Sequence, residues 1–126
     1  MYWLSIGVAL LVALGIIAIG FMYLLTPRAA TQSFGLPLPE AGSNIAWWLR
    51  LKGVRDIVAG LVLLGATMWG GHRIVGIALL IQAIIPVGDM SLILAARGST
   101  GRALGIHGLT AALMILAAIP LVMGAI

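Results

Sequence analysis

Charged and titratable side chains within the apolar segments of this sequence are the residues that could carry chemistry. Asp56, Asp89 and His107 can exchange protons, and histidine does so near neutral pH. Lys52 and Arg55 can hold an anionic or carbonyl oxygen through their N–H groups. These residue types predict a polar site in which three acid–base groups face two basic residues that can bind an anion.

Two further polar residues accompany this set. Gln82 is a candidate ligand-binding residue and a candidate interhelical hydrogen-bond partner. Arg50 is also a candidate for ligand binding, although it lies on a different side of its helix and can extend to lipid headgroups. We expect no metal site, because the two Asp and one His have no tight ligand spacing. The cofactor is unknown.

Three functions are compatible with these residues. The first is a pocket for an amphiphilic or anionic small molecule, with acid–base chemistry such as isomerisation. The second is a small transporter, which could work as a homo-oligomer. The third is a structural or accessory subunit whose charged cluster only fixes helix packing. The residues leave open whether the protein is an enzyme.

The composition predicts that a membrane surrounds the elements carrying these residues. Of the 126 residues, 63% are hydrophobic and only 8% are charged. Mean hydropathy is +1.22, and a soluble domain would have roughly a quarter charged residues. The net charge of +4 is spread over loops and one helix, which indicates membrane orientation and lipid contact rather than nucleic-acid binding. With no cysteine, disulfides and thiolate chemistry are excluded.

The apolar runs predict an all-α fold, a transmembrane four-helix bundle forming one domain over residues 1–126. Pro27 can open a short interfacial helix, Arg28 to Phe34, with Thr26 as its N-cap and Gly35 as its stop. Gly53 and Gly60 lie one heptad apart and predict close helix packing. The four long helices are expected at about residues 2–25, 44–69, 74–96 and 103–123.

Helical rise predicts that the polar groups share one depth. At about 1.5 Å per residue, Asp56 lies roughly 12–18 Å along its helix, Asp89 roughly 10 Å from its helix end and His107 roughly 6 Å into its helix. Ionisable groups in a membrane face the bundle interior. Pro86 should kink its helix just before Asp89 and leave room there. We therefore expect one cavity walled by Arg55, Asp56, Asp89 and His107.

The distribution of charged and aromatic residues predicts the orientation. Arg28, Arg97 and Arg102 lie in two loops at one face, whereas the opposite face has only Arg73. By the positive-inside rule both termini are outside the cell membrane, and loops 26–43 and 97–102 are cytoplasmic. Aromatic residues are expected to form belts at the two faces, with one belt made of Tyr2, Trp3 and Trp69 and the other of Tyr23, Trp47 and Trp48.

Five segments resemble a family of small four-span membrane proteins known as DUF4267, a domain of unknown function. The most specific are Lys52-Gly-x-Arg-Asp56 and Pro86-x-Gly-Asp89. The others are Thr26-Pro-Arg-Ala-Ala with Phe34-Gly-Leu-Pro, the turn with Arg73, and Gly105-Ile-His-Gly108. The resemblance spans nearly the whole chain. It implies four helices in a membrane and no particular activity.

Overall fold

The computed structural model describes residues 1–125 as an all-α protein. Within these residues there is no β-strand, and long helices alternate with short connections. The fold class expected from the sequence is confirmed in this respect. The helices in chain order are α1 (Tyr2–Leu25), α2 (Pro27–Thr31), α3 (Ser43–Trp69), α4 (His72–Ala95), α5 (Thr100–Arg102), the π-helix η1 (Ala103–Gly108) and α6 (Leu109–Met123).

The helix ends differ from the predicted bounds at several places. α4 begins two residues early, at His72, because Gly70 and Gly71 alone make the turn after α3. α2 begins after Thr26 with Pro27 at its first position, as expected, but ends at Thr31 instead of Phe34. The Thr26 hydroxyl does not cap α2, since it donates a hydrogen bond of 3.1 Å to the Met22 carbonyl in α1.

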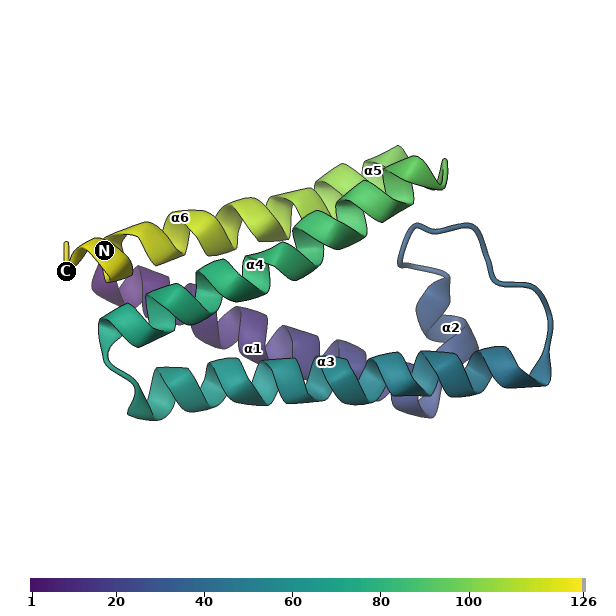
Figure 1. Cartoon of the computed structure of the whole chain (residues 1–126), viewed down its shortest axis with the longest axis horizontal. Coiled ribbons are helices and arrows are strands. Elements are labelled where there is room, and N and C mark those ends of the chain that lie inside the picture. Colours follow the sequence, from purple (N-terminus) through teal and green to yellow (C-terminus); the bar gives the residue numbers. More distant parts are fainter. Residues whose placement is uncertain (126) are drawn as a thin grey trace.

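The helices are arranged in two closely packed pairs. α1 lies along α3, and α4 lies along α6. Figure 1 shows both chain ends at the same end of the molecule, where α3 also turns into α4. From this turn α4 moves away from α3, with which it has fewer contacts than with α6. α2 and the chain leading into α3 lie at the other, open end.

Glycines bring α1 and α3 together at backbone distance. A Cβ atom on Gly53 would lie 2.6 Å from the Gly20 carbonyl oxygen, and one on Gly20 would lie 2.6 Å from the Gly53 oxygen. A Cβ on Gly60 would lie 2.7 Å from the Ala13 oxygen. The predicted close packing at Gly53 and Gly60 is therefore confirmed, and the packing occurs inside the chain. Any side chain at Gly53 would push the two helices apart.

The apolar core occupies the half of the molecule nearest the chain ends. Its residues come from the first half of α1, the end of α3, the start of α4 and the end of α6. This half is tightly packed, whereas the polar residues singled out by the sequence lie in the other half. The core residues are Ala9, Ala13, Leu63, Val75, Leu79, Ala83, Met114, Ala117, Ala118 and Leu121.

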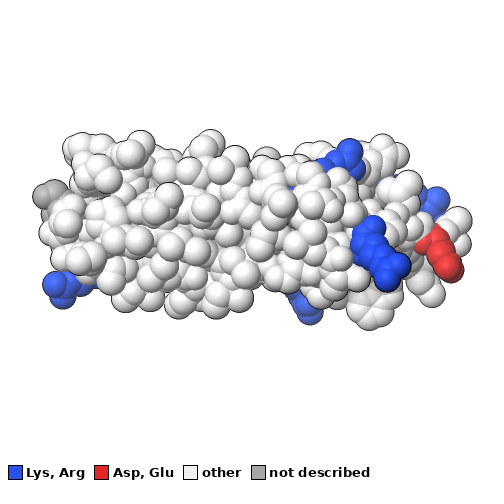
Figure 2. Space-filling view, turned by 90° about the horizontal axis from the view of Figure 1, so that it is seen from above, with Lys and Arg blue, Asp and Glu red and all other residues white. Residues whose placement is uncertain are grey.

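Most of the molecular surface is apolar. In the part of the chain that the structure describes, three helical segments are long and apolar enough to cross a membrane, namely Tyr2–Leu25, His72–Ala95 and Thr100–Met123. α3 is longer but less apolar, because its first half contains Arg50, Lys52, Arg55 and Asp56. Figure 2 shows the Lys and Arg side chains gathered toward the end opposite the chain ends, with one group at the other end.

Candidate functional site

Lys52 and Asp56 form an ion pair on α3. They are four residues apart and therefore lie one turn apart on the same helix face. The Lys52 Nζ donates to the Asp56 Oδ2 at 2.6 Å. The same ammonium lies 4.3 Å from the ring centre of Tyr23 on α1 and 5.2 Å from that of Phe34. One carboxylate and two aromatic rings thus hold the Lys52 cation, because ring faces attract positive charge.

Asp89 of α4 lies beside His107. The Asp89 Oδ2 is 3.6 Å from the His107 Nδ1, and the His107 Nε2 is 3.0 Å from the backbone oxygen of Phe34. A carbonyl oxygen only accepts hydrogen bonds, so Nε2 carries hydrogen and donates it to Phe34. In a neutral imidazole Nδ1 would then turn a lone pair toward Asp89. Repulsion between these acceptors is removed when one proton lies on Nδ1 or on the Asp89 carboxyl.

His107 lies in a π-helical segment that the sequence analysis did not predict. Instead of one regular helix from about residue 103, the chain forms α5, then η1 over Ala103–Gly108, and then α6. The extra residue in a π turn rotates the side chains of this segment relative to those of a regular α-helix. It leaves His107 only 8% exposed, turned toward Phe34 and Asp89.

The chain between α2 and α3 is fastened over the end of the polar cluster. The Ser99 amide donates to the Gly35 carbonyl at 2.8 Å, and the Arg102 guanidinium donates to the Gln32 carbonyl. Gly35 has a φ of +110°, in the range that favours glycine. Residues 32–35 therefore form a cap, and the Phe34 ring lies 4.7 Å from the His107 ring beneath it.

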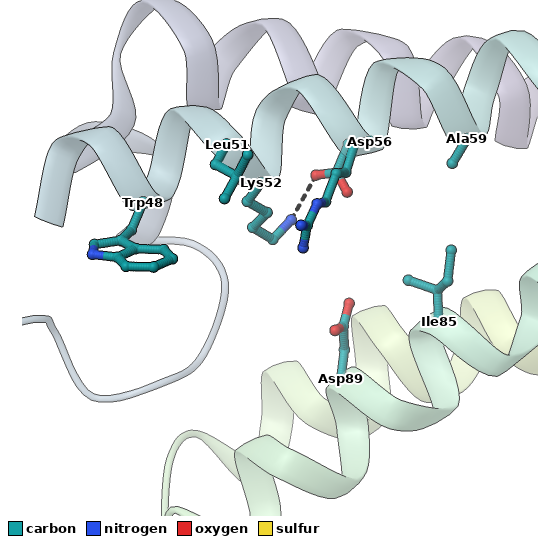
Figure 3. A pocket seen from close by; sticks show the side chains of 8 residues that line it. Trp48, Leu51, Lys52, Asp56, Ala59, Ile85 and Asp89 are labelled. Carbon is teal, nitrogen blue, oxygen red and sulfur yellow. Dashed lines mark hydrogen bonds and ion pairs between the residues drawn. The ribbon is translucent and has the colours of Figure 1, made fainter.

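Two cavities meet at these charged residues. The outer cavity, of about 400 Å³, lies between α3 and α4. The inner cavity, of about 390 Å³, extends along α1 and α6. Figure 3 shows Asp89 pointing from α4 toward Lys52 and Asp56 on α3. Both cavities are lined by Lys52, Asp56, Ile85 and Asp89.

The other predicted site residues are divided between the cavities. His107 and Gln82 line the inner cavity, and Arg55 lines the outer one. The sequence had predicted a single cavity with Arg55 and His107 in the same wall. Arg55 is exposed and lines only the outer cavity, between α3 and α4, whereas His107 lines only the inner one.

Arg50 lies at neither cavity. Its Nε donates to the Leu24 carbonyl at 3.2 Å, and its guanidinium lies 4.8 Å from the ring centre of Trp47. The Leu24 carbonyl belongs to the last turn of α1, where no intrahelical amide is available. Arg50 therefore connects the end of α1 to α3, and it does not line either cavity with the other predicted site residues.

Gln82 joins α4 to α3 and keeps one free acceptor. Its Nε2 donates to the Ala59 carbonyl at 2.8 Å, as expected of an interhelical partner. Gln82 is 8% exposed, and its Oε1 has no hydrogen-bond partner in residues 1–125. A buried acceptor without a donor is unfavourable by about 1–3 kcal/mol. Since Gln82 lines the inner cavity, a donor from a ligand or water can satisfy this oxygen.

Sequence reasoning did not identify Tyr23 and Phe34 as site residues. Tyr23 was expected in an aromatic belt at the membrane face, but it is 3% exposed and its ring faces Lys52. Phe34 lies outside any helix, so helical periodicity gives no information about its direction. The position of Tyr23 near the end of α1, level with Lys52, was the one available signal.

The site offers acid–base groups and hydrogen-bonding groups rather than a metal centre. Among residues 1–125, no three His, Asp, Glu or Cys side chains gather closely enough to hold a metal ion. The available chemistry is a cation held by aromatic rings, a carboxylate–imidazole pair and a buried amide oxygen.

These features define an all-helical protein with membrane-length apolar helices and a partly buried charged cluster. The chain belongs to the family described as Domain of unknown function (DUF4267), which matches residues 13–121. The resemblance noted in the sequence is therefore confirmed. All the cluster residues, from Tyr23 to His107, lie within the matched range. No curated protein and no solved structure matches the chain significantly.

Proposed function

We propose that this protein is a four-span membrane protein that binds an amphiphilic molecule in the inner cavity. The apolar part of the ligand lies along α1 and α6. Its polar head lies at Lys52, Asp89 and His107, under the cap formed by residues 32–35. Asp56, Arg55 and Arg50 have other roles in this proposal: Asp56 orients Lys52, Arg50 joins two helices, and Arg55 belongs to the outer cavity.

The observation that carries the proposal is the uneven lining of the inner cavity. Along α1 its wall is apolar, with Leu11, Gly15, Ile16 and Ile19 among the lining residues. Its charged lining is Lys52, Asp56, Asp89 and His107, and Gln82 adds a polar group about two helical turns from Asp89 along α4. An apolar chamber with a few convergent polar groups is typical of small-molecule sites, and its volume of about 390 Å³ is in their usual range.

Two features support an oxygen-bearing head. The Lys52 ammonium can attract an anionic or carbonyl oxygen, because Asp56 occupies only one of its three N–H donors. The Gln82 Oε1 has no donor, so a ligand hydroxyl or a bound water can donate to it. Carboxylates, carbonyl compounds and alcohols with an apolar chain fit these requirements.

The Asp89–His107 pair supports an acid–base role at the same site. The Asp89 Oδ2 lies 3.6 Å from the His107 Nδ1, and the Nε2–H is donated to Phe34, so a proton available for transfer would lie on Nδ1 or on the Asp89 carboxyl. A ligand oxygen bound by Lys52 could accept this proton, and the pair could later recover it. Whether a reaction accompanies binding depends on the ligand's own acidity.

A structural role is the second candidate, and the ion pairing favours it. Lys52 is paired with Asp56, and Asp89 is close to His107, so these charges are already largely balanced. A cluster that only fixes helix packing needs nothing else. This alternative predicts that filling the inner cavity does not change the amount of amphiphile bound to the protein.

A cavity-filling variant separates the two candidates. Gly15 lines the inner cavity, and a Cβ atom there would meet nothing within 4 Å. Gly15→Leu therefore adds a side chain to the cavity wall at a position where its Cβ meets no neighbour. Gly7→Leu is the matched control, because Gly7 lies on the same helix, is equally unobstructed and is outside the cavity.

The probe is a fluorescent fatty acid, which combines an anionic head with an apolar chain. We expect saturable binding to the purified protein and to Gly7→Leu, and at least about tenfold weaker binding to Gly15→Leu. Native mass spectrometry should likewise show co-purified amphiphiles on the unaltered protein and on Gly7→Leu, and fewer on Gly15→Leu. Equal binding to both variants, or no saturable binding, would favour the structural role.

A further inference from the structure

The outer cavity is lined by a cation that forms no ion pair with the described residues of the chain. Within residues 1–125, Lys52 pairs with Asp56, and Asp89 is 3.6 Å from His107. Arg55 lines the same cavity but has no ion-pair or hydrogen-bond partner in the part of the chain described. Arg55 is therefore the one charged residue lining the outer cavity that has no charged neighbour at ion-pair distance in residues 1–125.

Helix stability does not account for this arginine. Arg55 lies near the middle of α3, far from the last turn in which the helix dipole would favour a cation. It is also exposed on a helix that we propose to cross the membrane, and charge in that setting is unfavourable without a partner. An anion beside Arg55 would offset this cost.

The surroundings of Arg55 favour an anion attached to lipid. Trp48 lines the cavity on one side of Arg55 and is 68% exposed, which suits a residue at the boundary between headgroups and acyl chains. On the other side, the exposed Val58 and Val62 continue the same face of α3. A headgroup at Arg55 would thus have apolar surface along which its acyl chains can lie.

We propose that the outer cavity binds the phosphate headgroup of an anionic membrane lipid, with Arg55 as the phosphate-binding residue. The planar guanidinium can donate two parallel hydrogen bonds to phosphate oxygens. The cavity volume of about 400 Å³ admits a phosphodiester headgroup. The outer cavity shares Lys52, Asp56, Ile85 and Asp89 with the inner one, but Arg55 lines the outer cavity alone.

Trp48 provides a direct reporter of this site. Trp3, Trp47 and Trp69 are all more than two thirds exposed, at 81%, 67% and 82%, so Phe can replace them with little effect on packing. The resulting protein has Trp48 alone. It is placed in phosphatidylcholine vesicles containing an equal fraction of either brominated phosphatidylglycerol or brominated phosphatidylcholine, since bromine quenches nearby tryptophan.

We expect brominated phosphatidylglycerol to be enriched about fivefold beside Trp48, the effect of one basic residue near the membrane surface. Arg55→Gln should abolish this preference, and Arg55→Lys should retain part of it. Arg73→Gln is the control, because Arg73 is an exposed arginine at the other end of the molecule, and it should leave the preference unchanged.

The remaining outcomes contradict the proposal. Equal quenching by the two lipids would mean that no anionic headgroup is preferred. A preference that persists in Arg55→Gln would assign the anion to another residue. If millimolar inorganic phosphate removes the preference for phosphatidylglycerol in the protein that retains Arg55, the cavity binds free phosphate rather than lipid. Size-exclusion elution of each variant verifies that it has folded.

Discussion

At the scale of single residues, Lys52 connects the parts of the charged cluster. Its ammonium contacts Asp56 on its own helix, the Tyr23 ring on α1 and the Phe34 ring in the cap. Asp56 is 13% exposed at its side chain and Lys52 is 33% exposed. Their ion pair is therefore poorly screened by solvent, and losing one partner should matter more than at a surface pair.

Removing the charge of Asp56 should destabilise the protein. Asp56→Asn leaves Lys52 without its carboxylate in a partly buried position, and we expect a loss of about 2 kcal/mol. Thermal unfolding in detergent measures it. The double variant Lys52→Met/Asp56→Leu should recover most of the loss, because it leaves no unpaired charge. An unchanged melting temperature in Asp56→Asn would mean that water or a ligand compensates Lys52.

We expect the Asp89–His107 pair to carry one proton, either on the His107 Nδ1 or on the Asp89 carboxyl. In a His72→Gln background, nitrogen NMR of His107 should show either an imidazolium or a neutral ring protonated at Nε2. In the neutral case, infrared spectroscopy should show a protonated carboxyl band that Asp89→Asn removes. A neutral ring protonated at Nδ1, or a neutral ring beside an ionised Asp89, would contradict the geometry of the pair.

At the scale of the helices, the site depends on how two pairs are packed. α1 and α3 approach closely at Gly20 and Gly53, and α4 follows α6 away from α3. The opening between the pairs is where both cavities form. Gly76 plays a similar part in the second pair, since a Cβ there would lie 3.0 Å from the Leu121 Cβ.

A methyl group at Gly53 should separate α1 from α3. In Gly53→Ala the new Cβ would lie 2.6 Å from the Gly20 oxygen and 3.0 Å from the Leu24 amide nitrogen, which are both backbone atoms. We expect a loss of about 1–3 kcal/mol from this overpacking, measured by thermal unfolding. Gly65→Ala is the control on the same helix: its nearest atom is 3.9 Å away, so it should be neutral or slightly stabilising. Equal melting temperatures for the two variants would show that the contact is not tight.

At the scale of the whole molecule, the two halves are physically different. The half nearest the chain ends has a continuous core of small and aliphatic side chains. The other half contains the ion pairs, the cavities and the cap. The first half is stabilised by apolar packing, and in the second half ion pairs and aromatic rings line or border the cavities.

The distribution of basic residues leads us to propose that both chain ends are outside the cell. Arg28, Arg97 and Arg102 lie at the end opposite the termini, and Arg73 lies at the start of α4 near the termini. Fusions of alkaline phosphatase at Met1 and Ile126 should be active in a bacterial host, and green fluorescent protein fused there should be dark. Insertion of the fluorescent protein in loop 97–102 is the control for the opposite side. Fluorescence at either terminus would reverse the proposed orientation.

The sequence alone determined the all-helical class, the approximate helix bounds and the family. These features depend on local properties: apolar runs define long helices, and Gly and Pro mark their ends. It also indicated that Asp56, Asp89 and His107 lie at one depth, because rise per residue needs no tertiary information. The Lys52–Asp56 pair follows in the same way from a spacing of four residues.

The tertiary structure alone decided which of these groups face one another. Close contact at Gly20 and Gly53, with the separation of α4 from α3, divides one expected cavity into two. A π turn sets the direction of His107, and the cap brings in Phe34. Helical periodicity could not supply these results, since it fixes depth along a helix but not the rotation and tilt that packing against neighbours imposes.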